Sequence, residues 1–168
     1  MLKDQIRVAS PGDAEAILEI YAPIVIETAI SFELEPPTVS EMQERIKNIL
    51  IQFPWLVYEV DKKVVGYAYA STYRLRPAYQ WSAEVTAYVH KQFHGQGVGK
   101  TLYKALFEIL KKNGYYNAIA GIALPNAASV GLHEALGFSP VGVFSSLGYK
   151  QAIRPKQPSQ VNRCFVCI

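Results

Sequence analysis

Hydrophobic and polar residues along the chain follow two different periods, which predicts interleaved helices and strands. Apolar residues recur at helical spacing in three segments, residues 17–24, 42–50 and 102–110. Residues 10–13 (Ser-Pro-Gly-Asp) and 38–41 (Thr-Val-Ser-Glu) carry the capping and first-turn residues that begin helices, so they predict the start of the first two. Pro23 is expected to end or bend the first helix.

Apolar and β-branched runs predict six strands. They are Ile6–Ala9, Trp55–Val60, Val64–Thr72, Trp81–Val89, Tyr115–Ala123 and Phe138–Val143. The second and third flank Asp61-Lys62-Lys63, which is typical of a hairpin, and Asn126 is expected to cap a helix that Gly137 ends. The predicted fold class is α/β (α+β), a single domain with a mixed, mostly antiparallel sheet flanked by helices.

Composition narrows the protein class. With 168 residues, of which 50% are hydrophobic and 18% charged, the chain fits one packed domain. Its net charge of +3 suits an anionic ligand, and no clustered basic stripe indicates nucleic acid. No apolar run approaches the roughly 18 residues of a membrane helix, so we expect a cytoplasmic protein without membrane or nucleic-acid partners.

The two cysteines, Cys164 and Cys167, both lie in the last five residues. A structural metal site needs further ligands nearby, and the sequence offers none, so we expect no metal. A redox pair is one interpretation, but the pair lies in a short apolar segment and not at a helix start. Reduced, structural thiols are the preferred interpretation.

A glycine-rich segment, residues 94–100 (His-Gly-Gln-Gly-Val-Gly-Lys), connects a predicted strand to a predicted helix. Glycines let backbone N–H groups approach a phosphate closely, and a helix N-terminus adds partial positive charge, which Lys100 reinforces. A flexible connection that binds nothing is the alternative. A P-loop would need glycine at position 94, and a dinucleotide fingerprint would need glycine at position 100, so neither motif fits.

The spacing from His94 to Gly99 instead resembles the acetyl-CoA loop of the GCN5-related N-acetyltransferases (GNAT), which is Arg or Gln, two variable residues, Gly, one variable residue, then Gly or Ala. His94 departs from that pattern at the first position. Residues 126–138 are similar to the second cofactor-side motif of the family, which runs from Asn to Gly-Phe.

His133 stands where the family often has tyrosine. Together with residues 28–33, 76–79 and 81–89, it resembles the phosphinothricin and methionine-sulfoximine acetyltransferase branch. The resemblance covers roughly residues 5–150. It implies a GNAT-like fold, acetyl-CoA as cosubstrate, a homodimer, and acetyl transfer to the α-amino group of a small amino-acid-like acceptor of the phosphinothricin, methionine sulfoximine or methionine sulfone type.

The predicted domain organisation follows from where the resemblance ends. Residues 1–150 are expected to form the N-acetyltransferase domain, and residues 151–168 an atypical C-terminal tail. The branch normally continues with a Gly-Trp-x-Asp type segment, whereas Pro155-Lys156-Gln157-Pro158 stands here. Val161–Ile168 could still supply the last strand.

Two residues are candidates for proton transfer. Glu84 lies in an apolar strand with Thr86 and Tyr88 on the same face, where burial could make it a useful base, acting directly or through water. A structural ion pair with Arg or Lys is the alternative for Glu84. His133 titrates near neutrality when unperturbed, with core packing as its alternative.

The resemblance assigns two further groups of residues. The expected cofactor-binding residues are Tyr88, Val89, His90, His94, Gly95, Gln96, Gly97, Val98, Gly99, Lys100, Asn126 and Ser129. Asn126 could equally be a simple helix cap. The expected substrate-binding residues are Phe32, Glu33, Arg74, Arg76, Tyr79, Trp81 and Thr86.

The substrate-binding residues divide by chemistry. The guanidinium groups of Arg74 and Arg76 suit a carboxylate or phosphinate, although a solvated surface charge is an open alternative for Arg74. Tyr79 and Trp81 could form an apolar wall, and Phe32 with Glu33 could close the pocket from the first helix. A non-catalytic CoA-binding regulatory module and a nucleotide-binding phosphotransferase remain as alternative functions.

Overall fold

The computed structural model describes residues 4–145, 148–150, 160–161 and 164–167. The chain divides into two compact units, the first made of residues 1–20 and 37–118, and the second of residues 21–36 and 119–168. Helix α1, Ala14–Glu27, begins in the first unit and ends in the second.

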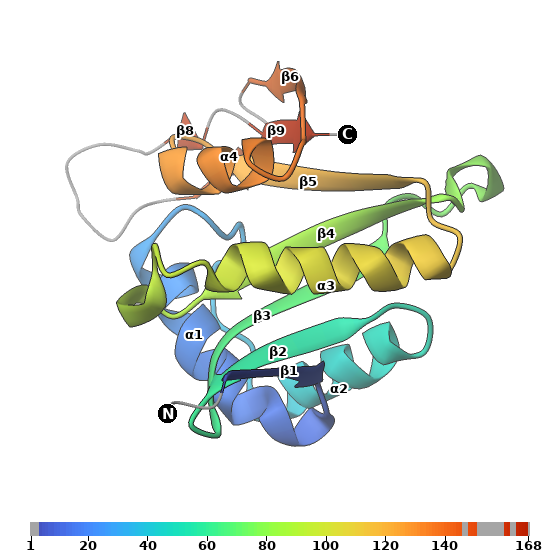
Figure 1. Ribbon diagram of the computed structural model, residues 1–168. Coiled ribbons are helices and arrows are strands. Elements are labelled where there is room, and N and C mark those ends of the chain that lie inside the picture. The colour runs from blue at the N-terminus through green and yellow to red at the C-terminus, as the bar shows by residue number, and fades with distance from the viewer. Residues whose placement is uncertain (1–3, 146–147, 151–159, 162–163, 168) are drawn as a thin grey trace. The chain divides into compact units, whose positions relative to one another are not determined.

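The first unit is built on an antiparallel sheet in the order β1-β2-β3-β4 (Figure 1). Its strands are β1 (Asp4–Val8), β2 (Trp55–Val60), β3 (Lys63–Thr72) and β4 (Ser82–Val89). The hairpin predicted for β2 and β3 is confirmed. Its turn places Asp61 and Lys62 at positive φ angles of 49° and 67°.

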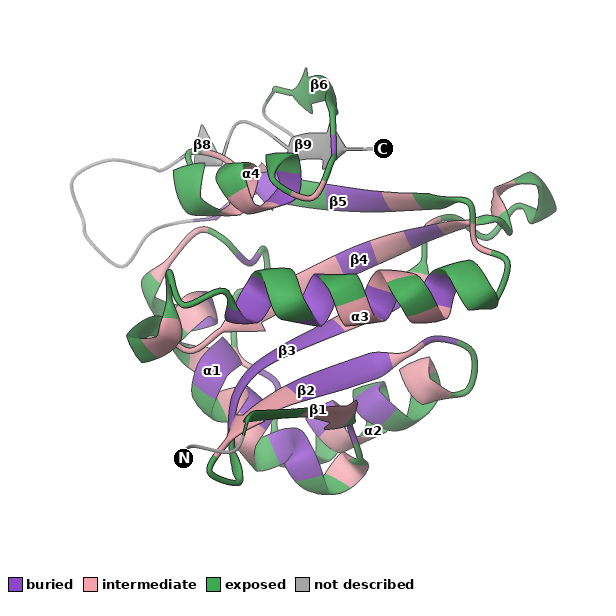
Figure 2. Ribbon diagram, in the orientation of Figure 1, coloured by how far each residue is buried: buried purple, intermediate pink, exposed green. Residues whose placement is uncertain are grey.

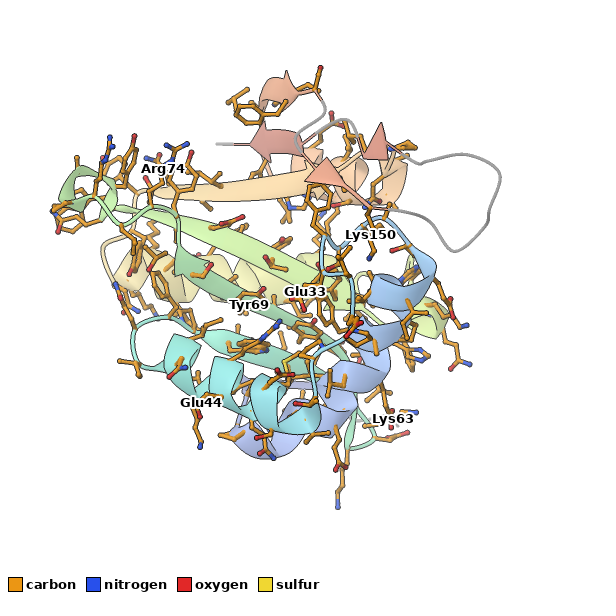
Figure 3. The ribbon with its side chains drawn as sticks, turned by 180° about the vertical axis from the view of Figure 1, so that it is seen from behind. Glu33, Glu44, Lys63, Tyr69, Arg74 and Lys150 are labelled. Atoms are coloured by element: carbon orange, nitrogen blue, oxygen red, sulfur yellow. The ribbon has the colours of Figure 1, made fainter. Side chains whose placement is uncertain are left out.

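Two helices cover opposite faces of this sheet, α3 (Val98–Lys112) in Figure 1 and α2 (Val39–Leu50) in the reversed view of Figure 3. Figure 2 shows that buried residues recur along α3 and form a stripe. The stripe contains Val98, Gly99, Leu102, Tyr103, Leu106 and Leu110. Burial of such a stripe is the main stabilising term for an amphipathic helix.

The predicted helix starts are confirmed at their caps. Thr38 accepts a hydrogen bond from the Glu41 N–H at 3.2 Å, and the Glu41 carboxylate accepts one from the Thr38 N–H at 2.7 Å. The expectation that Pro23 could end α1 is wrong, because α1 continues through Pro23 to Glu27. The fully buried Val25 lies beyond the proline, and its packing offsets the one hydrogen bond that Pro23 removes.

The second unit contains β5 (Asn117–Ala123), whose first two residues belong to the first unit, and α4 (Ala127–Glu134). Its remaining strands are β6 (Pro140–Phe144), β7 (Gly148–Tyr149), β8 (Gln160–Val161) and β9 (Cys164–Cys167). Strand β9 pairs antiparallel with both β5 and β6, and β7 pairs antiparallel with β8. The predicted fold class, helices on mostly antiparallel strands, is confirmed. The structure describes the backbone of Cys164 and Cys167 but not their side chains, so the interpretation of the pair as reduced, structural thiols stays a prediction.

Candidate functional site

One face of β4 carries the predicted base. Glu84, Thr86 and Tyr88 alternate along the strand and therefore share a face. Across the β3–β4 ladder, Glu84 pairs with Ser71, Thr86 with Tyr69, and Tyr88 with Tyr67. This face is opposite the one on which α3 packs, because a Cβ added at Gly66, in the alternate set of β3, would meet Val98 and Leu102 of α3.

The Glu84 side chain is half-buried, and burial raises its pKa above the ordinary value. Within the described residues, Glu84 takes part in no hydrogen bond or ion pair. The structural alternative, a carboxylate paired with an arginine or lysine, is therefore not what the described residues show. A carboxylate with a raised pKa and no fixed partner binds a proton more readily, which general base catalysis requires.

Aromatic rings line the same face beside Glu84. The Trp55 ring stacks on Tyr69 with centroids 4.3 Å apart and lies 5.8 Å from Tyr67, which in turn lies 5.6 Å from Tyr88. Figure 3 labels Tyr69 at this position. Trp55, Tyr67 and Tyr69 are not among the residues predicted from the sequence, although the alternation Tyr67, Tyr69, Ser71 in one strand indicates a common face.

Trp55 is unusual within this cluster. Its side chain is buried, and its Nε1–H has no hydrogen-bond partner in the part of the chain that the structure describes. Buried N–H donors normally have a hydrogen-bond partner. Among the described residues, the Trp55 Nε1–H is an exception to this rule.

The loop between β3 and β4 holds the predicted arginines. The Arg74 guanidinium lies 5.2 Å from the Tyr73 ring centroid and 5.5 Å from that of Tyr79, which is cation–π geometry (Figure 3). Arg74 is exposed, so its two open interpretations are both compatible with this geometry. Arg76 is also exposed and precedes the short 3₁₀ helix η2 (Pro77–Tyr79). Trp81 is exposed and not part of a buried wall.

The glycine loop follows the end of β4, after the 3₁₀ helix η3 (Lys91–Phe93). Gly95 and Gly97 have positive φ angles of 74° and 83°, and a Cβ at either would meet nothing within 4 Å. Glycine is therefore favoured there by backbone conformation, and the space over the loop is open. Gly97 precedes α3, which has no side-chain cap and no acidic residue in its first turn. The first N–H groups of α3 and the Lys100 side chain can meet an anion.

His94, which departs from the family pattern, has a structural contact. Its Nε2 lies 2.8 Å from the carbonyl oxygen of Val89, the last residue of β4. The ring therefore ties the loop to the strand end. Gln96 makes a comparable contact, because its Nε2 donates to the Gln92 carbonyl at 2.9 Å.

Within the second unit, His133 is buried on α4. Its Nδ1 lies 2.7 Å from the Ser129 carbonyl oxygen, so Nδ1 carries the proton that is donated to this oxygen. Burial lowers the pKa of His133, and the hydrogen bond to Ser129 opposes this in part. The Phe138 ring packs edge-on against the imidazole with centroids 5.0 Å apart. The ring is thus neutral near pH 7, and Nε2 is its basic nitrogen.

Asn126 acts as a helix cap, because its Oδ1 accepts a hydrogen bond from the Ser129 N–H at 3.2 Å. This is the simpler of its two predicted roles, and contact with the cofactor stays a prediction for both residues. Phe32 and Glu33 lie in the irregular loop after α1 and not on the helix itself, which ends at Glu27. Phe32 is 42% exposed.

The predicted site residues thus fall into two groups. The first unit holds Arg74, Arg76, Tyr79, Trp81, Glu84, Thr86, Tyr88, Val89, His90 and residues 94–100. The second unit holds Phe32, Glu33, Asn126, Ser129 and His133. The described residues contain no group of three or more His, Cys, Asp or Glu that could hold a metal ion. Among those same residues, we find no helix with the length and apolar character of a membrane span.

Comparison with known families identifies the fold. Residues 6–153 match the Acetyltransferase (GNAT) domain. The chain belongs to the GNAT acetyltransferase family. A phosphinothricin N-acetyltransferase of Streptomyces viridochromogenes is 37% identical over 87% of this chain and 80% of its own length. An L-methionine sulfoximine/L-methionine sulfone acetyltransferase of Salmonella typhimurium is 32% identical over 86% of this chain and 85% of its own length.

A solved GNAT structure shows the same fold. The phosphinothricin acetyltransferase of Sinorhizobium meliloti, determined in complex with acetyl-CoA, superposes with a TM-score of 0.88 at 30% identity. The superposition covers 98% of this GNAT chain and 87% of that one.

Proposed function

We propose that this GNAT enzyme transfers the acetyl group of acetyl-CoA to the α-amino group of a small amino-acid-like acceptor, of the phosphinothricin, methionine sulfoximine or methionine sulfone type. The names of relatives that are 37% and 32% identical support this acceptor class. The structural observation that carries the proposal is Glu84, a half-buried carboxylate without a partner among the described residues, on the strand that leads into the glycine loop.

The first unit fits the phosphate end of acetyl-CoA. The space over Gly95 and Gly97 is open, the start of α3 has no side-chain cap, and Lys100 is exposed. The first N–H groups of α3 and the Lys100 ammonium group can therefore donate hydrogen bonds to a diphosphate. We assign to cofactor binding the residues Tyr88, Val89, His90, 94–100, Asn126 and Ser129. When bound, acetyl-CoA supplies an acetyl thioester with an electrophilic carbonyl carbon.

Glu84 serves as general base in this proposal. Its carboxylate accepts the proton that the acceptor's amino group loses, directly or through water, and this leaves a nitrogen lone pair for attack. Because burial raises the pKa of Glu84, its carboxylate holds the accepted proton more strongly than an ordinary glutamate does. His133 is neutral with its Nδ1 proton donated to Ser129, so its Nε2 can accept the second proton that the nitrogen loses as the amide bond forms and pass it to the departing thiolate.

We assign to acceptor binding the predicted residues Arg74, Arg76, Tyr79, Trp81, Thr86, Phe32 and Glu33. The guanidinium groups suit the acceptor's carboxylate or phosphinate. Tyr69, which stacks on Trp55 and pairs with Thr86 across the ladder, also contacts the acceptor in this proposal.

The test is release of free thiol from acetyl-CoA by purified protein, with a panel of phosphinothricin, methionine sulfoximine, methionine sulfone and unrelated amines. We expect release only with the amino-acid-like acceptors. If calorimetry shows acetyl-CoA binding while no amine causes release, the protein is instead a non-catalytic CoA-binding module.

We also propose that residues 1–150 form the acetyltransferase domain and residues 151–168 a tail that completes the last strand. The pairing of β9 with β5 and β6 supports this division.

We further propose a cytoplasmic homodimer. The scarcity of cysteine supports a reducing compartment, and the exposed apolar side chains of β6, Val141, Val143 and Phe144, are compatible with a second copy. Sedimentation analysis measures the oligomeric state.

A further inference from the structure

The loop between α1 and α2 has no regular secondary structure around Phe32 and Glu33, so side-chain contacts must fix its conformation. Some contacts are local. The Tyr21 hydroxyl lies 2.8 Å from Ser31 Oγ and donates to Glu33 Oε1 at 3.0 Å. The Ser31 hydroxyl also accepts from the Glu33 N–H at 3.2 Å.

A distant residue, Lys150, completes this arrangement. Its Nζ donates to the carbonyl oxygen of Ser31 at 2.9 Å and to that of Val25 at 2.6 Å (Figure 3). Lys150 is only 6% exposed, which is rare for a lysine. Val25 lies in the last turn of α1, a turn that has no basic residue of its own. Lys150 therefore provides the cation that favours a helix C-terminus, and the same ammonium holds the loop.

Gly148 contacts the same loop two residues earlier in the chain. A Cβ added at Gly148 would lie 2.6 Å from Cε2 and 2.9 Å from Cδ2 of Phe32. Real Cβ atoms do not approach carbon so closely, so any side chain at position 148 must displace the Phe32 ring. The ring thus packs directly on the backbone of β7, while 42% of Phe32 remains exposed.

We propose that Gly148 and Lys150 are positioning residues for the acceptor: Lys150 fixes the Ser31 backbone, and Gly148 sets the orientation of the adjacent Phe32 ring against which the acceptor's side chain binds. This inference rests on the proposed function, in which Phe32 is a substrate-binding residue. Gly148 and Lys150 therefore determine affinity for the acceptor and not for acetyl-CoA.

The test compares wild type, Gly148→Ala, Phe32→Ala and the double variant Phe32→Ala/Gly148→Ala, with KM measured for both substrates. Gly142→Ala is the matched control, since a Cβ there would meet nothing within 4 Å and Gly142 lies outside the proposed site. We expect Gly148→Ala to raise the acceptor KM on the order of tenfold with the acetyl-CoA KM unchanged, because a misplaced binding group weakens productive binding. In the Phe32→Ala background the same change should have no further effect.

Lys150→Met is the second variant, and its melting temperature is recorded so that loss of folding is distinguished from loss of positioning. A folded Lys150→Met enzyme should show a raised acceptor KM with an unchanged acetyl-CoA KM. An unchanged acceptor KM in Gly148→Ala, or an equal effect of Gly148→Ala with and without Phe32, would overturn the inference. A wild type that acetylates none of the panel acceptors would instead overturn the proposed function, and the inference with it.

Discussion

Glu84 on β4 lies directly opposite Ser71 on β3, with the Tyr69–Thr86 pair as the next neighbours on the same face. The residue opposite Glu84 is thus Ser71, which has a neutral hydroxyl group and carries no positive charge. Burial acts on the Glu84 carboxyl without compensation from a cation among the described residues, so its pKa is raised. Perturbed carboxylates of this kind are frequent at functional sites.

Replacing Glu84 by Gln removes the proposed base while conserving shape. We expect kcat to fall by about 10²–10⁴-fold, the usual contribution of a general base, with little change in acetyl-CoA affinity. The wild-type rate should also rise with pH, with its acid limb above the ordinary glutamate pKa of 4.5. Steady-state kinetics across pH measures both effects, and an unchanged kcat would exclude Glu84 from the mechanism.

The same substitution should stabilise the fold at neutral pH. Above pH 4.5 the unfolded chain loses the Glu84 proton while the folded protein still holds it, so rising pH favours unfolding until the raised folded pKa is passed. The Glu84→Gln variant has no carboxyl group at this position, so rising pH does not destabilise it in this way. Urea denaturation should show the variant at least as stable as wild type near pH 7, with the advantage shrinking toward pH 4. A variant less stable than wild type at pH 7 would argue that Glu84 has a favourable ionic partner.

Local features of the sequence predicted most of the fold. The caps at Thr38 and Asn126 and the hairpin of β2 and β3 follow from hydrogen bonds and periodicity within short segments. The continuation of α1 through Pro23 could not be predicted from a short segment, because the tertiary burial of Val25 overrides the local cost of proline.

The candidate site was predictable where its residues are consecutive, as in the glycine loop and β4. Contacts between distant segments were not predictable. The Trp55–Tyr69 stack depends on strand register, and the contacts of Lys150 with Val25 and Ser31 span 125 and 119 residues. No periodicity in a single segment encodes such pairings.

Gly97→Ala tests the backbone of the loop. Gly97 has φ of 83°, so alanine is strained there by about 1–2 kcal/mol although its Cβ would meet nothing within 4 Å. We expect a raised acetyl-CoA KM with a nearly unchanged acceptor KM. Gly12→Ala is the control, because Gly12 has no positive φ and its Cβ would make an ordinary 3.5 Å contact with Ser10 Oγ. Equal effects of both variants on the acetyl-CoA KM would contradict a specific role for the loop.

His133 should make stability depend on pH in the opposite direction from Glu84. Its folded pKa is lowered below 6.5, so the unfolded chain takes up a proton at a pH where the folded protein does not. Wild-type stability should therefore fall as pH decreases from about 6.5 toward the folded pKa. The variant His133→Gln, compared by denaturant titration between pH 5 and 8, should lack this component. An identical pH dependence in both proteins would show that His133 is not held neutral.

Amide hydrogen exchange of residues 94–101, measured with and without saturating acetyl-CoA, tests the central claim most directly. The first N–H groups of α3 and those of the glycine loop are expected to become protected, because they donate to the diphosphate. The control is the exposed β6, whose exchange should not change. Binding of acetyl-CoA without added protection in residues 94–101 would contradict the account.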